Sequence, residues 1–195
     1  MRRTAALALS LALVAWPAAA PASDRVSATF SAGACKGATS AAPGDATLPR
    51  LTGRVVDEAH ILSAPARASL TRRLARLEAA TSDQLVVVTL PDLRGRTIEA
   101  WGRALGNGWR IGRRGLDNGV LLVVAPNDRK VRIEVGCGLE GLLTPARSAA
   151  IVRDPLLPLL KASRYDAAAE AGVARIAAVL ARDTRRPQPP REARR

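Results

Sequence analysis

Hydrophobic and polar residues follow two different periods along the middle of the chain. Residues 84–90 and 119–125 are nearly continuous apolar runs, which are typical of strands covered on both faces. Residues 131–135 alternate between apolar and polar side chains, as a half-exposed strand does. The turn residues 126–129 and Lys130 separate the last two runs, so we expect a β-hairpin there.

Other segments have the spacing of amphipathic helices. Ser63 and Thr97 are typical N-cap residues for the first two helices, and a Thr-Pro pair at 144–145 starts a third. We expect the Asp-Pro pair at 154–155 to interrupt the chain before a terminal helix. The apolar residues that share a helix face are Leu70, Leu74 and Leu77 in the first helix, Ile98, Trp101 and Leu105 in the second, and Ala169, Val173, Ile176 and Leu180 in the last.

A short strand at Val55 and Val56 precedes the first helix and ends at Asp57. Helices that alternate with buried strands, together with one hairpin, predict an α/β fold. We expect a layered α/β/α sandwich around a mixed sheet of about four strands that includes this hairpin.

The first 22 residues have the features of a signal peptide. Arg2 and Arg3 precede an apolar run over residues 5–16, and small residues offer a cleavage site near Ala22. A single-pass anchor is the alternative reading, but an apolar run of about 12 residues is short for a bilayer. We therefore expect export and a periplasmic or secreted protein that is soluble after cleavage.

Composition divides the remaining chain into three parts. Residues 23–48 are rich in Ala, Ser, Gly and Thr, as a flexible lead-in is. Residues 49–181 form the patterned α/β domain. Residues 182–195 form a basic tail that is rich in Pro and Arg.

The net charge of +13 comes from 30 Lys and Arg against 17 Asp and Glu. About +2 of it lies in the predicted signal peptide and about +4 in the tail. A nucleic-acid partner would favour stacking aromatic residues, which make up only 3% of the chain, and the export signal argues against it. We therefore expect no nucleic-acid partner and interpret the tail as a contact for an anionic membrane surface or an acidic partner.

The predicted hairpin brings polar residues together. If its strands are antiparallel, Asp117 and Asn118 lie near the loop 136–141, which contains Glu140. Three glycines within that loop would allow positive φ angles and a close approach to a ligand. Carboxylates with an amide oxygen favour a hard cation, Ca²⁺ or Mg²⁺.

Asp57 could join this cluster if its strand runs parallel to the one that ends at Gly136. The alternatives are ordinary structural roles. Asp57 could cap the turn before the first helix, Asp117 could belong to a turn before a strand, and Glu140 could be a solvated loop residue.

The small numbers of His and Cys residues exclude several kinds of catalytic and metal site. The one His, His60, excludes most Ser–His and Cys–His catalysis unless that residue serves, and its place between a strand and a helix favours a structural role. Two Cys cannot form a four-thiolate zinc site.

Several ordered segments resemble the TPM domain family. The opening segment is GRVVDEAHIL at 53–62, and the most distinctive stretch is RKVRIEVGCGLEG at 129–141. The other matching segments are 77–87, 98–99, 109–112 and 117–122.

The resemblance implies an exported or envelope-associated α/β sandwich that binds a divalent cation, notably calcium, with weak acid phosphatase activity in some members. The acidic positions of the family match Asp57, Asp117 and Glu140. Position 137, usually aromatic in the family, is Cys here. Many bacterial relatives continue into a membrane segment or a Gly-rich tail, and we expect neither in this protein.

Two functions follow from the resemblance. In a cation-dependent phosphatase, Asp57 or Asp117 would hold the metal or attack, and Arg132 could face the phosphate. Arg132 could equally be a solvent-facing strand residue. The alternative function is a non-catalytic, cation-stabilised module that docks on envelope proteins during their assembly or turnover.

Cys137 and the additional Cys35 suggest a disulfide that fixes the lead-in across the glycine loop. Two unrelated thiols are the alternative, because the sequence does not show whether the two Cα atoms are close enough to be bridged.

Overall fold

The computed structural model describes residues 48–182. The predicted signal peptide 1–22, most of the lead-in (23–47), and the tail residues 183–195 lie outside the described residues, so these assignments stay predictions. Within 48–182, no helix is long and apolar enough to cross a membrane.

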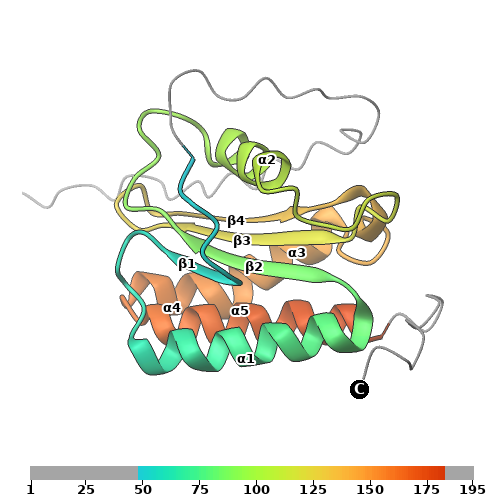
Figure 1. Cartoon of the computed structure of the whole chain (residues 1–195). Coiled ribbons are helices and arrows are strands. Elements are labelled where there is room, and N and C mark those ends of the chain that lie inside the picture. Colours follow the sequence, from blue (N-terminus) through green and yellow to red (C-terminus); the bar gives the residue numbers. More distant parts are fainter. Residues whose placement is uncertain (1–47, 183–195) are drawn as a thin grey trace, which may run out of the picture.

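Helices and strands alternate along the chain as the hydrophobic pattern predicts (Figure 1). The predicted strands and the N-cap positions Ser63, Thr97 and Thr144 are all present. The main elements are β1 (Val55–Asp57), α1 (Ala64–Thr81), β2 (Gln84–Thr89), α2 (Ile98–Gly108), β3 (Gly119–Ala125), β4 (Lys130–Val135), α3 (Pro145–Ile151), α4 (Leu157–Lys161) and α5 (Tyr165–Leu180).

The four strands form one mixed sheet in the order β1-β2-β3-β4. β1, β2 and β3 are parallel, whereas β3 and β4 form the antiparallel hairpin. Asp57 pairs with Thr89 at one edge of the sheet, and Gln84 pairs with Gly119 at the opposite edge. The predicted α/β sandwich with a mixed four-stranded sheet is therefore confirmed.

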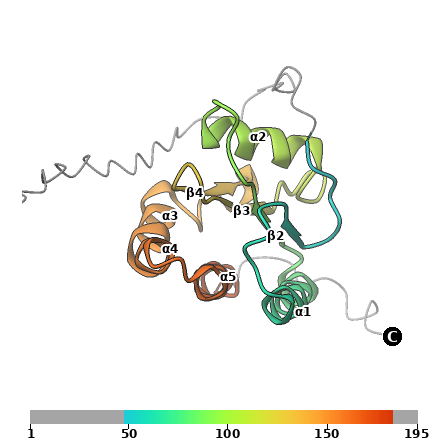
Figure 2. The ribbon, with the colours of Figure 1, turned by 90° about the vertical axis from the view of Figure 1, so that its left-hand side faces the viewer.

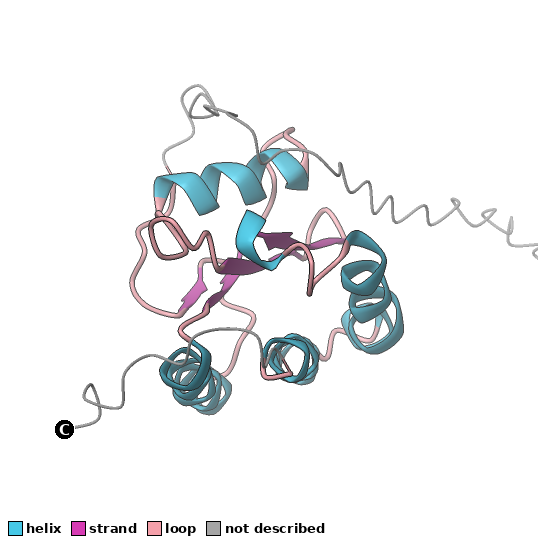
Figure 3. Cartoon of the chain, turned by 90° about the vertical axis from the view of Figure 1, so that its right-hand side faces the viewer, coloured by secondary structure: helices cyan, strands magenta, loops and turns pink. Residues whose placement is uncertain are grey.

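Helices cover both faces of the sheet, which lies between them as the middle layer (Figures 2 and 3). α2 covers one face alone, and α1, α3, α4 and α5 cover the other. Side chains of β2 alternate between the two faces: Leu85 and Val87 pack toward α1 and α5, and Val86 and Val88 pack toward α2. Burial on both faces explains why β2 and β3 are continuous apolar runs.

Helices α1 and α5 lie side by side and begin at the same end of the sheet (Figure 1). The Ser63 hydroxyl accepts a hydrogen bond from the Ala66 N–H, which caps α1. The Ser63 N–H in turn donates to the Asp166 carboxylate of α5 at 2.9 Å. Ser63 therefore links the starts of α1 and α5.

The Asp-Pro pair at 154–155 disturbs the helix without ending it. The chain runs from α3 through a π-helical turn (Val152–Leu156) directly into α4. Proline lacks an N–H and its ring clashes with the preceding turn of an α-helix. The wider π turn accommodates that ring, so the expected break is instead a change of helix type.

Candidate functional site

The predicted acidic residues lie at two opposite edges of the sheet. We call the edge where β1 to β3 end the Asp57 edge, and the edge where β2 and β3 begin and β4 ends the Asp117 edge. Since β1 is parallel to β3 and β4 is antiparallel to it, β1 runs opposite to β4. From Thr89 at one edge to Gln84 at the other, β2 takes five residue steps, which span roughly 16 Å. Asp57 could join Asp117 and Glu140 only if β1 ran parallel to β4, and it does not.

The Asp57 carboxylate is buried and accepts several hydrogen bonds. Its side chain is 4% exposed. One oxygen accepts from the Thr89 hydroxyl at 2.6 Å and the Ile61 N–H at 3.2 Å. The other accepts from the Leu62 N–H at 3.1 Å and lies 3.3 Å from Arg67 Nη1. These contacts match the structural alternative, in which Asp57 holds the turn before α1.

His60 belongs to the loop that Asp57 organises. It is exposed, has a left-handed backbone with φ of 51°, and donates its N–H to the Asp57 carbonyl at 3.2 Å. Its backbone therefore forms part of the tight turn between β1 and α1.

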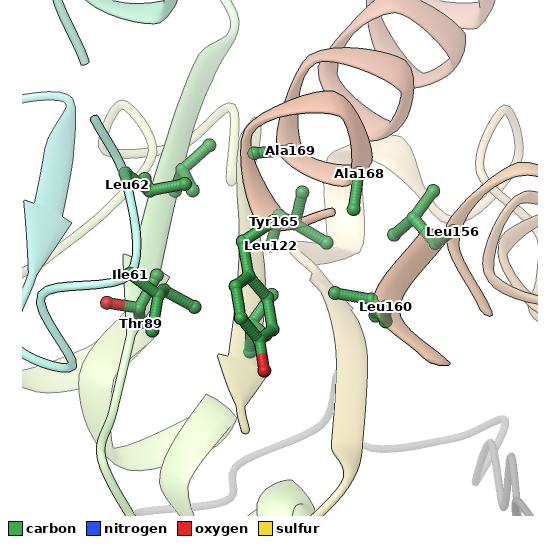
Figure 4. A pocket seen from close by; sticks show the side chains of 11 residues that line it. Ile61, Leu62, Thr89, Leu122, Leu156, Leu160, Tyr165, Ala168 and Ala169 are labelled. Carbon is green, nitrogen blue, oxygen red and sulfur yellow. The ribbon is translucent and has the colours of Figure 1, made fainter. Parts of the chain in front are cut away.

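A small apolar pocket lies where the parallel strands end, between the loop after β1 and helices α4 and α5 (Figure 4). Its volume of about 10 Å³ holds about one water molecule. The Tyr165 hydroxyl points away from Ala169 in this view (Figure 4). Side chains thus fill the crevice where open α/β sheets commonly bind ligands. The lining residues are Ile61, Leu62, Val87, Thr89, Leu122, Val124, Leu156, Leu160, Tyr165, Ala168 and Ala169.

At the Asp117 edge, the loop after β4 packs against the loop before β3, as the hairpin geometry predicts. The Gly138 N–H donates to the Asp117 carbonyl at 3.1 Å. A Cβ atom at Gly136 would lie 2.2 Å from that carbonyl oxygen, and one at Gly138 would lie 1.9 Å from the Leu116 carbonyl oxygen. Both glycines are required because two backbone segments touch.

The expected positive φ angles occur in a different loop. None of the glycines at 136, 138 and 141 has a positive φ, whereas Gly112, Gly115 and Asp117 do. The close approach that we expected toward a ligand is an approach to the chain's own backbone. The prediction of positive φ angles in the loop 136–141 was wrong because glycine permits both close packing and unusual φ angles, and here close packing is the reason for it.

Asn118 is a buried structural residue at the Asp117 edge. Its amide nitrogen donates to the Ser82 carbonyl at 2.8 Å and to Asp83 Oδ1 at 3.1 Å. Its amide oxygen accepts from the Arg113 N–H at 2.9 Å. With 1% of its surface exposed, Asn118 joins the turn between α1 and β2 to the loop before β3.

Asp117 and Glu140 belong to the two loops that meet at this edge. Asp117 is exposed in a left-handed conformation, with φ of 46°. Glu140 is half-buried and follows a 3₁₀ turn (Cys137–Leu139). In the described part of the chain, no group of three or more His, Cys, Asp or Glu side chains could hold a metal ion. The two carboxylates could contribute only part of a coordination shell.

Arg132 lies at neither edge. It is in the middle of β4 on the face covered by α2, and its side chain is 10% exposed. Its Nε atom is 2.5 Å from Glu134 Oε2, and its Nη1 atom is 3.6 Å from Glu99 Oε1. Arg132 is thus neither beside Asp57 or Asp117 nor a solvent-facing residue.

The ion pairs of Arg132 with Glu134 and Glu99 were not predicted from the sequence. Residues 132 and 134 share a strand face because side chains alternate along a strand, and this signal was available. Glu99 is on α2, and its approach to β4 depends on how that helix packs.

Cys137 is exposed and disulfide-bonded at the Asp117 edge. The other Cys of the chain, Cys35, lies outside the described residues, so its pairing with Cys137 stays a prediction.

A family model described as the TPM domain matches residues 55–179, which span β1 to α5. The chain belongs to the TPM domain family. No curated protein matches it.

Three NMR structures resemble this TPM domain. The N-terminal domain of a P. gingivalis protein is 32% identical, with a TM-score of 0.62, 66% of this chain covered and 82% of that one. The N-terminal domain of a Corynebacterium glutamicum protein is 17% identical, with a TM-score of 0.53 and coverages of 68% and 82%. A protein from the psychrophilic bacterium Bizionia argentinensis is 18% identical, with a TM-score of 0.54 and coverages of 62% and 81%. At these identities, the last two show the fold alone.

Proposed function

We propose that this TPM domain is an exported interaction module that binds a divalent cation and docks on envelope proteins without hydrolysing phosphomonoesters. The observation that supports the proposal is the separation of Asp57, Asp117 and Arg132. Metal-assisted phosphoryl transfer needs the cation, the nucleophile and the phosphate-binding cation around one phosphorus atom. Here two of these residues lie at opposite sheet edges, and the third is ion-paired beneath α2.

The bonding of Asp57 supports the same conclusion. A nucleophilic or metal-binding carboxylate needs a lone pair that faces the substrate or the ion. The Asp57 oxygens instead accept from two backbone N–H groups and the Thr89 hydroxyl. The nearby pocket is apolar and is too small for a phosphomonoester.

The cation would be held at the Asp117 edge by Asp117 and Glu140. Both are accessible to solvent, and the Gly138–Asp117 hydrogen bond holds their loops together. Asn118 and Asp57, the other predicted ligands, are engaged elsewhere. Two carboxylates with water at the remaining positions would suit Ca²⁺ or Mg²⁺ with weak affinity, a Kd of about 0.1–1 mM as in extracellular calcium modules.

The same edge has features that suit protein docking. Leu116 is 54% exposed, which is unusual for a large apolar side chain in this domain. Arg113 and Arg114 beside it are also exposed. An exposed apolar residue surrounded by charge resembles the anchor of a protein interface, and a cation on the neighbouring acids would stabilise its loop.

The cation is tested by thermal unfolding. At about ten times Kd, Ca²⁺ should raise the melting temperature by about 4 °C, because ligand binding stabilises the folded state by about 1.4 kcal/mol. Asp117→Asn combined with Glu140→Gln should abolish the shift. The matched control, Glu58→Gln with Glu170→Gln, removes two exposed carboxylates elsewhere and should keep it. An unchanged melting temperature in the unmodified protein would remove the cation from the proposal.

The absence of catalysis is tested separately on p-nitrophenyl phosphate, at acidic and neutral pH, with Ca²⁺ or Mg²⁺. We expect turnover equal to that of heat-inactivated protein. Turnover that Asp117→Asn abolishes and Glu58→Gln preserves would establish a phosphatase and overturn the non-catalytic proposal.

A further inference from the structure

Arginine side chains gather on the outer surface of the α1–α5 pair. The two helices lie side by side on one face of the sheet and begin at the same end (Figures 1 and 3). We call their solvent-facing arginines that form no ion pair the basic helical face, which leaves out Arg67 of α1 because it is paired with Asp57. All five are exposed: Arg72, Arg73 and Arg76 on α1, Arg175 on α5, and Arg182 just after α5.

The charge of this face is largely unopposed. On α1, Glu78 is bound to Arg54 at 2.6 Å, and on α5 the Asp166 carboxylate accepts the Ser63 N–H. Glu170 is an exposed acid on α5. Within residues 48–182, no ion pair engages the five arginines of the basic helical face.

The basic helical face lacks the exposed aromatic and large apolar anchors of many protein interfaces. The exposed α1 residues among its arginines include Thr71, Ala79 and Ala80, which are small. The exposed large hydrophobic residues of the described chain are Leu51 and Leu116, and neither lies on α1 or α5. The residues that dominate protein interfaces are mainly Trp, Tyr and Arg, and of these three only arginine is exposed on α1 and α5. Adsorption to an anionic lipid surface needs only positive charge near the headgroups.

We propose that the basic helical face binds the surface of an anionic phospholipid membrane. Each guanidinium can donate two parallel hydrogen bonds to a headgroup phosphate. The five further arginines of residues 183–195 follow Arg182 directly in the sequence and would add to the same attraction. This proposal is independent of the cation at the Asp117 edge.

Co-sedimentation of the full chain with vesicles tests the proposal. The protein should bind vesicles of equal parts phosphatidylglycerol and phosphatidylcholine more tightly than pure phosphatidylcholine, and high salt should release it. Arg72→Gln, Arg73→Gln and Arg76→Gln together should weaken binding to the anionic vesicles by at least about tenfold. These positions are exposed, so unchanged melting temperatures should show that the variant is folded.

A matched variant removes the same charge elsewhere. Arg94→Gln, Arg103→Gln and Arg129→Gln are exposed changes outside α1 and α5 and should alter binding less than about twofold. Both variants keep the same N-terminal segment, so the contribution of that segment cancels in the comparison.

Four results would overturn the assignment. Equal losses in the two triple variants would indicate net charge alone. Binding that disappears only when residues 183–195 are deleted would assign it to the tail. Equal binding to neutral vesicles would exclude an electrostatic contact with lipid, and tighter binding to soluble poly-glutamate than to vesicles would indicate an acidic protein partner.

Discussion

At the scale of single residues, Asp57 shows how one carboxylate can fix a loop. The side chain type and its place after a strand were evident in the sequence. Its role was left open there, because Thr89 is 32 residues away along the chain and only pairing of β1 with β2 brings it near. The sequence could not separate a catalytic acid from a structural one at this position.

Replacing Asp57 should therefore reduce stability. Asp57→Ala leaves the Ile61 and Leu62 N–H groups and the Thr89 hydroxyl without their acceptor, so we expect the free energy of unfolding to fall by about 3 kcal/mol. Urea denaturation measures this change. Asp92→Ala is the control, because that exposed carboxylate accepts one hydrogen bond, from the Arg94 N–H, and its loss should be below about 1 kcal/mol. Equal losses in both variants would contradict the structural role.

At the scale of elements, the periods of the sequence predict the helices and strands well. The relative direction of β1 and β4 could also have been predicted from the sequence. Helical crossovers make β1, β2 and β3 parallel, and the hairpin reverses β4, so Asp57 had to lie away from Gly136. The π turn at Pro155 was less accessible, since proline more often ends a helix than widens it.

The contact between the two loops of the Asp117 edge can be tested at two glycines. Gly138→Ala places a Cβ atom 1.9 Å from the Leu116 carbonyl oxygen, so we expect a loss of about 3 kcal/mol as the loops separate. Gly141→Ala is the control in the same loop, because nothing lies within 4 Å of a Cβ atom there and its φ is not positive. Its melting temperature should change by less than about 2 °C. If Gly138→Ala were equally harmless, the two loops would not be in contact.

At the scale of the whole molecule, the predicted link between the domain and its lead-in is a disulfide at Cys137. We expect peptide mapping without reductant to recover a peptide pair that joins Cys35 to Cys137, because these are the two Cys of the chain and Cys137 is disulfide-bonded. Addition of a reductant should raise the mass by two hydrogens. Two free thiols in protein isolated without reductant would contradict the pairing.

The order of the strands has a consequence for how the domain is made. Each strand lies beside the strand that precedes it in the chain, so a chain that emerges from its amino end can extend the sheet one strand at a time. The apolar core under α2 is made of residues up to Ala125, and this face needs only Arg132 and Glu134 of β4 to be complete. The other face waits for Val173 and Ile176 of the last helix. A partly synthesised chain therefore has one covered face of the sheet and one exposed apolar face. That exposed face can associate with other chains until α5 covers it.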